Sequence, residues 1–207
     1  TPTGLYLEPA ATNLIASQSS ESSSWNQYFN SSVSTGFLDP AGTNTARKWT
    51  YPDNTVTNHQ LSQINYAVSG LAANTTYTYS FYVRSDDTNP TNIRTAIYNT
   101  GASTLHLNKV FTVTSNWQRV QSTVTTDSTG GLILIHIRTT TTKQDTYEAF
   151  GHQLELGYHA SSYIPTSGST VTRAADVYTS TANLTETFEP RGLLIEEART
   201  NLVYYSE

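Results

Sequence analysis

The sequence predicts an all-β protein built as an antiparallel sandwich or barrel, and three observations support this. Apolar and polar residues alternate over many short segments, which is the pattern of half-buried strands. Turn-forming residues recur between these segments, and no long stretch shows the period of a helix. Only 13% of the residues are charged, so Ser, Thr and Asn must keep the surface polar, as is typical of exposed β-proteins.

Length and charge argue against several classes of function. The 207 residues can form one large or two small domains with a core that needs no metal or disulfide. The formal net charge of −5 argues against a nucleic-acid partner, because phosphate binding needs a basic surface. The chain has no basic amphipathic stretch and no long apolar run, so membrane insertion is not expected. The absence of cysteine excludes disulfides and thiolate metal sites.

The first 45 residues are expected to be mostly irregular, with short apolar islands and a Ser-rich stretch before Trp25. A turn is predicted at 39–42, where the sequence reads DPAG, because Pro restricts φ and Gly tolerates positive φ. The first clear strand is predicted at 46–51.

The middle of the chain holds the best-defined strands. They are predicted at 62–68 and 77–85, joined by a turn at 70–76. In the second strand one face carries Tyr77, Tyr79, Phe81 and Val83, and the other carries Thr78, Ser80, Tyr82 and Arg84. The apolar face is expected to lie on the core.

Five further strands complete the prediction, at 94–100, 110–114, 117–126, 132–140 and 147–156. A tight turn at 128–131 precedes the fourth of them. In that strand one face carries Ile133, Ile135 and Ile137, and the other carries Leu134, His136 and Arg138.

The segment from Ser161 to Glu189 contains few large apolar side chains, and Pro165, Gly168 and Pro190 interrupt it. We expect it to run along the surface as an extended C-terminal arm. The predicted domain limits are 1–160 for the sandwich, 161–191 for the arm or linker, and 192–207 for a separate element.

The two ends of the chain carry the same motif. Residues 4–15 read GLYLEPAATNLI and residues 192–203 read GLLIEEARTNLV, with seven of twelve positions identical at an offset of 188 residues. The identical pairs are Gly4/Gly192, Leu5/Leu193, Glu8/Glu196, Ala10/Ala198, Thr12/Thr200, Asn13/Asn201 and Leu14/Leu202. This offset is too long for a solenoid repeat and matches one whole domain.

Two interpretations of the repeat remain open, and both predict an array of modules. In one, 192–207 begins a second module after a tandem duplication. In the other, it adds as a strand to the next module or subunit, through backbone hydrogen bonds and alternating side-chain pockets. The residues assigned to this assembly strand are Gly192, Leu193, Leu194, Ile195 and Leu202.

Four stretches resemble jelly-roll carbohydrate-binding modules, in particular a subset found in bacteriophage tail, fibre and other virion proteins. They are GLAANTTYTYSFYVRS at 70–85, FTVTSNWQRVQSTV at 111–124, FGHQLELGYHASSYIPTSGSTVTRAADV at 150–177 and GLLIEEARTNLVYYSE at 192–207. The resemblance implies a jelly-roll β-sandwich on a virion surface or outside the cell. It also implies partners that are other copies of the chain, other virion proteins or cell-surface polysaccharide.

The resemblance does not extend to a calcium site. Many secreted jelly-roll modules place an Asp before the QLE-like segment, where this chain has Gly151 beside His152. Without that carboxylate a calcium ion loses a main oxygen ligand. Asn13 and Glu155 could still contribute, but backbone and turn hydrogen bonds are the favoured role for both. No metal or other cofactor is therefore predicted.

A sugar-binding face is the first candidate site. Sugars are bound by aromatic rings together with hydrogen-bonding groups, because a pyranose has an apolar face and a rim of hydroxyls. The residues assigned to carbohydrate are Trp25, Tyr82, Arg84, Tyr98, His136 and Arg138. The competing interpretation is an ordinary solvated sheet face or a subunit contact.

The three tryptophans are expected to differ in exposure. Trp49 and Trp117 stand at strand starts and are predicted to cover the edge of the core. Trp25 lies in a Ser-rich stretch near Tyr28 and Phe29, and we expect it to be the most exposed of the three.

Catalysis has little support. Carboxylates that glycoside hydrolysis could use are present at Asp86, Asp87, Asp145, Glu148 and Glu155, but sequence does not give their spacing. The five histidines show no metal-ligand spacing, and no hydrolase or phosphate-loop motif occurs. We therefore predict a non-enzymatic protein, and the resemblance implies a virion structural role as a fibre or surface decoration that binds host-surface glycans. The alternative is a secreted carbohydrate-binding module attached to a polysaccharide-degrading enzyme.

Overall fold

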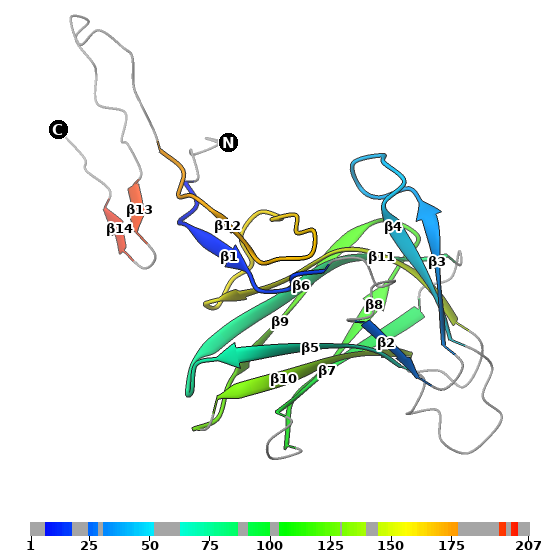
Figure 1. Ribbon diagram of the computed structural model, residues 1–207. Coiled ribbons are helices and arrows are strands. Elements are labelled where there is room, and N and C mark those ends of the chain that lie inside the picture. Colours follow the sequence, from blue (N-terminus) through cyan, green and yellow to red (C-terminus); the bar gives the residue numbers. More distant parts are fainter. Residues whose placement is uncertain are drawn as a thin grey trace, which may run out of the picture. The chain divides into compact units, whose positions relative to one another are not determined.

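The computed structural model describes residues 7–17, 25–28, 31–51, 63–86, 91–99, 104–128, 130–139, 145–177, 195–197 and 200–202. All regular structure in these ranges is β-strand, which confirms the predicted fold class (Figure 1). None of the described residues forms a helix that could cross a bilayer. Contacts divide the chain into a larger unit, Thr12–Thr172, and a smaller one formed by Thr1–Ala11 and Arg173–Glu207.

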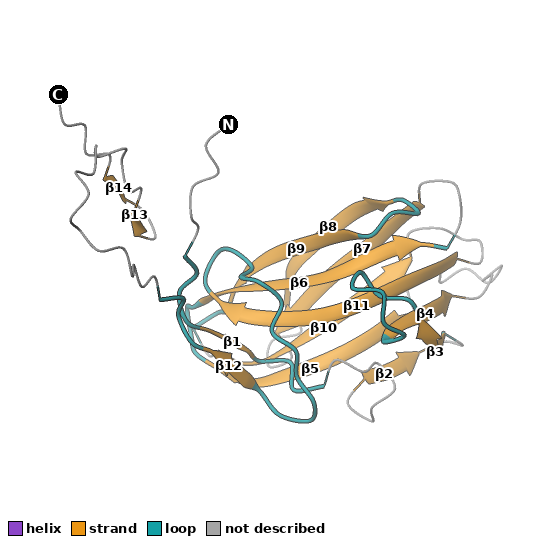
Figure 2. Ribbon diagram, turned by 90° about the horizontal axis from the view of Figure 1, so that it is seen from above, coloured by secondary structure: helices purple, strands orange, loops and turns teal. Residues whose placement is uncertain are grey.

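The larger unit is a sandwich of two five-stranded antiparallel sheets, which lie one over the other in Figure 2. The first sheet has the order β2-β5-β10-β7-β8, and the second has the order β3-β4-β11-β6-β9. The strands are β2 (Trp25–Tyr28), β3 (Ser32–Phe37), β4 (Ala46–Tyr51), β5 (Gln63–Leu71), β6 (Thr76–Ser85), β7 (Thr91–Asn99), β8 (Thr104–Val113), β9 (Gln118–Thr125), β10 (Gly131–Thr139) and β11 (Asp145–Leu156). A separate two-stranded sheet pairs β1 (Ala11–Asn13) with β12 (Val171–Arg173).

The predicted alternation in β6 is confirmed and sets the register of the second sheet. Tyr77, Tyr79, Phe81 and Val83 are all buried in the core. Their neighbours in sequence therefore point to the opposite face of the sheet. β6 pairs with β9 on one side and β11 on the other, so Tyr82 stands opposite Arg119 and Phe150.

An aromatic cluster forms the centre of the core, and His152 lies within it. The His152 ring stacks on Trp49 at 5.3 Å and on Phe81 at 5.2 Å between ring centroids. Its Nδ1 lies 2.8 Å from the hydroxyl of Tyr79. Burial lowers the pKa of His152 to about 3, so the imidazole is neutral at pH 7. This histidine is therefore part of the core packing.

Trp25 corrects a prediction. The residue is only 3% exposed, and it was expected to be the most exposed of the tryptophans. Its ring lies 4.6 Å from His152 and 4.8 Å from Tyr66, and its Nε1 donates a 2.8 Å hydrogen bond to the carbonyl of Ser17. The serines before Trp25 indicated an exposed loop. Trp25 is instead the first residue of β2, an edge strand, and its side chain enters the core.

The start of the predicted arm also differs from the expectation. Ile164 is 2% exposed, and the compact unit continues to Thr172, beyond the predicted boundary at residue 160. Hydrogen bonds to buried polar side chains hold this part in place, although it carries few large apolar residues. Residues 178–191 of the predicted arm lie outside the described residues.

The smaller unit contains a charged cluster and a short hairpin. Arg173 pairs with Glu8 at 2.8 Å and with Asp176 at 3.4 Å. The hairpin joins β13 (Ile195–Glu197) and β14 (Thr200–Leu202). Of the residues assigned to an assembly strand, Ile195 stands opposite Leu202 in this hairpin, whereas Gly192, Leu193 and Leu194 lie outside the described residues.

Candidate functional site

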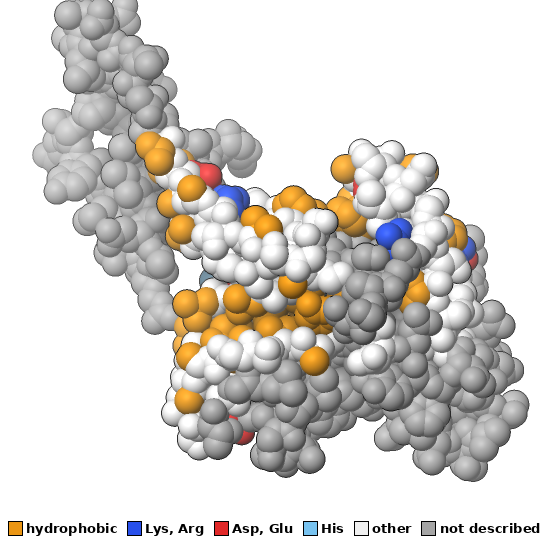
Figure 3. Space-filling view, viewed as in Figure 1, with side chains coloured by type: hydrophobic (Ala, Val, Ile, Leu, Met, Phe, Trp, Pro, Cys, Tyr) orange, Lys and Arg blue, Asp and Glu red, His pale blue; other side chains and the backbone are white. Residues whose placement is uncertain are grey.

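A groove of about 720 Å³ lies between the turn that joins β3 to β4 and the segment that follows β11. In the space-filling view it is the hollow between these two raised loops (Figure 3). Strands β4, β6 and β11 form its floor. Its lining residues are Asp39, Pro40, Ala41, Thr43, Thr45, Arg47, Tyr82, Ala149, Phe150, Gly151, Tyr163, Pro165, Thr166 and Ser167.

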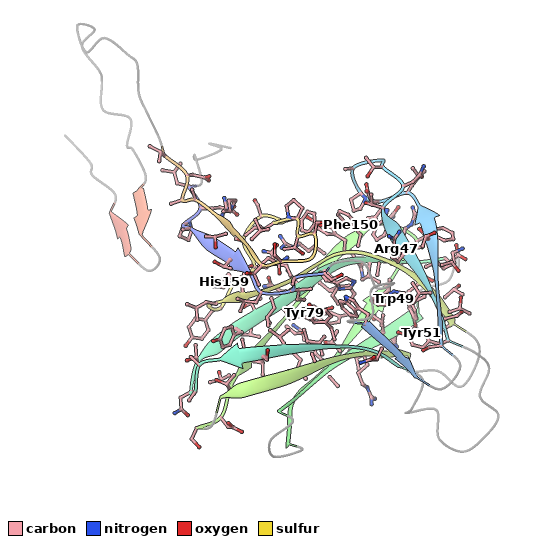
Figure 4. All side chains as sticks on the ribbon, viewed as in Figure 1. Arg47, Trp49, Tyr51, Tyr79, Phe150 and His159 are labelled. Atoms are coloured by element: carbon pink, nitrogen blue, oxygen red, sulfur yellow. The ribbon has the colours of Figure 1, made fainter. Side chains whose placement is uncertain are left out.

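Three aromatic side chains form the apolar part of the groove. The rings of Tyr82 and Phe150 are tilted at 45° with centroids 6.1 Å apart. Tyr163 meets Phe150 edge to face at 5.0 Å. These spacings fall in the range in which aromatic pairs attract one another, so the three rings support each other's orientation. Figure 4 shows Phe150 beside Arg47 at this end of the molecule.

Gly151 allows the rings to come together. It has a φ of +66°, and the pairing of β11 with β6 shifts by a bulge between Phe150 and Gln153. A β-carbon at Gly151 would lie 3.2 Å from the rings of both Tyr82 and Tyr163. The backbone conformation therefore favours glycine here, and any β-carbon would also press on the two rings. This is the position at which the related secreted modules were expected to carry an Asp.

The turn at Asp39 forms one wall of the groove, and the DPAG turn prediction is confirmed there. The Asp39 carboxylate accepts hydrogen bonds from the backbone N–H groups of Ala41 and Thr43, at 2.8 and 3.0 Å. It also accepts from the hydroxyls of Thr43 and Thr45. Burial alone would raise the pKa of Asp39, but these hydrogen bonds outweigh it and lower the pKa. Asp39 is therefore ionised and holds the turn that presents the threonines.

The polar groups of the groove suit a neutral ligand that is rich in hydroxyls. Burial, with a smaller contribution from the negative charge of Asp39, raises the pKa of Tyr163, so its phenol stays protonated. Arg47 and Asp39 give the lining one charge of each sign. Threonine and tyrosine hydroxyls can each donate and accept a hydrogen bond.

Polar contacts on β11 hold the second wall, residues 157–167, in place. Glu155 accepts hydrogen bonds from the backbone N–H and the hydroxyl of Ser161, both at 2.7 Å. Gln153 accepts a 2.7 Å bond from the N–H of Ile164. Arg119 donates to the carbonyl of Ser161 at 2.6 Å. This wall is therefore anchored on β9 and β11, next to the aromatic rings.

The structure brings few of the predicted sugar-binding residues together. Tyr82 lines the groove. Arg84 lies further along β6, where it forms a 2.6 Å ion pair with Glu148 and lies 4.9 Å from the ring of Trp117. Trp25 is in the core. The side chains of Tyr98, His136 and Arg138 are not described, and their strands β7 and β10 belong to the other sheet.

Sequence reasoning missed most of the groove. Phe150 and Tyr163 were not assigned to a face, because the bulge at Gly151 changes the phase of β11 and Tyr163 lies in the predicted arm. The wall residues Thr43 and Thr45 follow a turn that was recognised only as a turn. The departure at Gly151 was the signal available in the sequence, and it was interpreted only as the loss of a calcium ligand.

Asn13 and Glu155, the two side chains considered as calcium ligands, both form hydrogen bonds within the protein. Asn13 bonds to backbone groups of His152, Ile15, Leu154 and Ile164. Glu155 bonds to Ser161 and to Gln153. Among the described residues, no group of three His, Cys, Asp or Glu side chains is placed to hold a metal ion.

The carboxylates considered for catalysis have structural partners. Asp86 pairs with Lys48 at 2.8 Å, Glu148 pairs with Arg84, and Asp145 accepts a 2.9 Å bond from the Tyr147 hydroxyl. Asp87 lies outside the described residues.

Comparisons with known proteins support the fold. No protein-family model and no curated protein matches the sequence. Among solved structures, the CBM22-1 xylan-binding domain of Xyn10C from Paenibacillus barcinonensis is similar, with a TM-score of 0.52 and 14% identity. The match covers 77% of this chain and 100% of that domain. The tandem CBM22-1–CBM22-2 structure of the same protein matches with a TM-score of 0.52 and 14% identity, over 78% of this chain and 48% of that one.

These likenesses confirm the jelly-roll sandwich of carbohydrate-binding modules as the fold of this chain. Tailspike protein 4 of bacteriophage CBA120 also aligns, over 70% of this chain and 21% of that one, with 9% identity and a TM-score of 0.47. A score this low says nothing about the origin of the chain. At such identities the comparisons concern the fold alone.

Proposed function

We propose that the protein is a non-enzymatic glycan-binding module and that the groove beside Tyr82 is its binding site. The observation that carries this proposal is that three aromatic rings and a set of hydroxyl groups line the same groove. The rings are those of Tyr82, Phe150 and Tyr163, and the hydroxyl groups of Thr43 and Thr45 lie on the opposite wall. Aromatic faces suit the apolar face of a sugar ring, and hydroxyl groups suit its rim. The fold, which is that of carbohydrate-binding modules, supports the same function.

The charge of the lining favours neutral over highly charged glycans. Asp39 is buried and held by four hydrogen-bond donors, so it contributes negative charge without being available as a direct ligand. Arg47 balances that charge. A polysaccharide of uncharged hexoses or pentoses therefore fits the groove better than a sulfated or polyphosphorylated one.

Two biological settings suit such a module. The first is a bacteriophage virion, where the chain would serve as a fibre or surface decoration that contacts host-surface glycans. The repeated end motif, which predicts an array of modules, supports this setting. The second is a secreted carbohydrate-binding module attached to a polysaccharide-degrading enzyme.

Binding to a polysaccharide panel tests the proposal. We expect the chain to bind at least one member of a panel containing xylan, cello-oligosaccharides and bacterial cell-surface polysaccharides. Tyr82→Ala should weaken that binding at least tenfold, which corresponds to about 1.4 kcal/mol. Tyr158→Ala is the matched control, because Tyr158 is 57% exposed and does not line the groove. Equal affinities of the two variants would place binding elsewhere, and no binding to any member would refute the function.

A further inference from the structure

Asn13 ties the N-terminal segment into the sandwich. Its side chain is fully buried, and its Nδ2 donates to the carbonyls of His152 at 3.0 Å and Ile164 at 2.9 Å. Its Oδ1 accepts from the backbone N–H groups of Ile15 at 3.0 Å and Leu154 at 3.2 Å. The amide thus uses all of its hydrogen-bonding capacity, and a buried polar group satisfied in this way is costly to remove.

The neighbours of Asn13 complete a seat for residues 12–15. The N–H of Leu14 donates to the carbonyl of Leu154 at 2.8 Å, and the hydroxyl of Thr166 donates to the carbonyl of Ile15 at 2.7 Å. The side chain of Ile15 is fully buried. At the other end, the hydroxyls of Thr12 and Thr172 lie 2.8 Å apart. We call the residues that make these contacts the seat; they are His152, Leu154, Ile164, Thr166 and Thr172.

Residues 200–203 match residues 12–15 in every side chain but one. Thr200, Asn201 and Leu202 are identical to residues 12–14, and Val203 differs from Ile15 by one methylene. The remaining contacts are to backbone atoms, which any residue supplies. Val fills an Ile site with a small loss of packing, so the second segment matches the seat nearly as well as the first.

We propose that residues 200–203 of one copy of this chain occupy the seat of a second copy, in the place of its residues 12–15. Each copy has one seat and two segments that fit it. Exchange of one segment for the other replaces contacts with equivalent contacts and so costs little, as in domain swapping. The competing state of residues 200–202 is the β13–β14 hairpin, whose strands have three residues each, and an isolated hairpin is only marginally stable.

Disulfide trapping tests this exchange cleanly, because the chain has no cysteine of its own. In the seat, the residue at position 200 of one copy would lie beside Thr172 of the other, at the 2.8 Å side-chain distance now found for Thr12. Such a position is compatible with a disulfide. A Thr172→Cys chain is therefore mixed with a Thr200→Cys chain under mild oxidation, and heterodimers are identified by mass spectrometry.

We expect the heterodimer cross-linked between positions 172 and 200 to form several-fold faster than the heterodimer in a control mixture of Thr123→Cys with Thr200→Cys. Thr123 is an exposed threonine on β9, outside the seat, so this mixture measures random encounter. Adding Asn201→Ala to the Thr200→Cys chain should remove the difference. Adding Asn13→Ala to the Thr172→Cys chain should increase it several-fold, because the resident segment then holds its seat less well.

Two results would overturn the proposal. One is a heterodimer rate equal to the Thr123→Cys control while the double variant Thr12→Cys/Thr172→Cys forms its internal disulfide readily. The other is an unchanged rate after Asn201→Ala, because a cross-link that ignores the asparagine does not pass through the seat. Both results use unmodified Asn13, so they remain valid if the Asn13→Ala chain folds poorly.

Discussion

Gly151 connects the backbone of β11 to the shape of the groove. We predict that Gly151→Ala destabilises the protein by about 1–3 kcal/mol, because alanine is strained at positive φ. It should also weaken glycan binding, because the new methyl group displaces the rings of Tyr82 and Tyr163. Gly36→Ala is the matched control, since it has a φ of +85° and no atom within 4 Å. Denaturant unfolding and binding titration of both variants measure the two effects; equal binding losses would contradict the role given to Gly151.

His152 should make stability depend on pH. Its pKa is about 3 in the folded protein and 6.5 in an unfolded chain, so the unfolded state binds more protons between these values. Stability should therefore fall as the pH drops from 6.5 toward 3, by up to about 1.4 kcal/mol per pH unit from this group. His152→Phe should be less stable at pH 7, because Tyr79 loses its partner, but its stability should fall less steeply with acid. An unchanged slope would show that the pKa of His152 is the same in the folded and unfolded states.

Single residues differ in how far sequence could predict them. The placement of Tyr82 away from the core followed from strict alternation in β6 and was correct. Trp25 was misjudged, because composition around a residue does not reveal whether an edge strand turns its side chain inward. The face of β11 on which Phe150 lies could not be predicted from sequence, because a bulge at a positive-φ glycine interrupts the alternation of side chains.

At the scale of elements, the segment 157–167 is held by buried polar groups rather than by apolar packing. We predict that Glu155→Ala loosens this wall, because three hydrogen bonds to the carboxylate are lost and Ser161 loses its main partner. The expected cost is about 1–3 kcal/mol. Hydrogen exchange should accelerate in residues 157–167 and remain unchanged in β10, which belongs to the other sheet. Exchange that stays slow in 157–167 would mean that other contacts hold the wall.

The same polar anchoring explains which elements were predicted. Strands with one apolar and one polar face, such as β6 and β9, were recognised because apolar and polar side chains alternate along them. β11 is buried on both faces, because Gln153 and Glu155 on its polar face are covered by residues 157–167. The covering segment was predicted to be an arm, since it has few large apolar residues. β2 and β3, which are short and polar, carried no alternation strong enough to be recognised.

At the scale of the whole molecule, the groove and the seat are neighbouring features of one sandwich that share Thr166. The groove would bind the glycan, and the seat would bind residues 200–203 of another copy of the chain. Asn201→Ala should therefore lower cross-linking through position 200 to the rate of random encounter without changing glycan affinity. Tyr82→Ala should weaken glycan binding without changing the rate of cross-linking. The two proposals can accordingly fail independently of each other.

Glycan binding in the groove beside Tyr82 is tested most directly by NMR titration of the isotope-labelled full chain with the polysaccharide fragment that binds best in the panel. We predict that amide shifts concentrate at Tyr82, Phe150, Gly151 and Tyr163 and in the turn that begins at Asp39. Shifts confined to Tyr98, His136 and Arg138 on the other sheet, or no shifts with any fragment, would contradict this prediction.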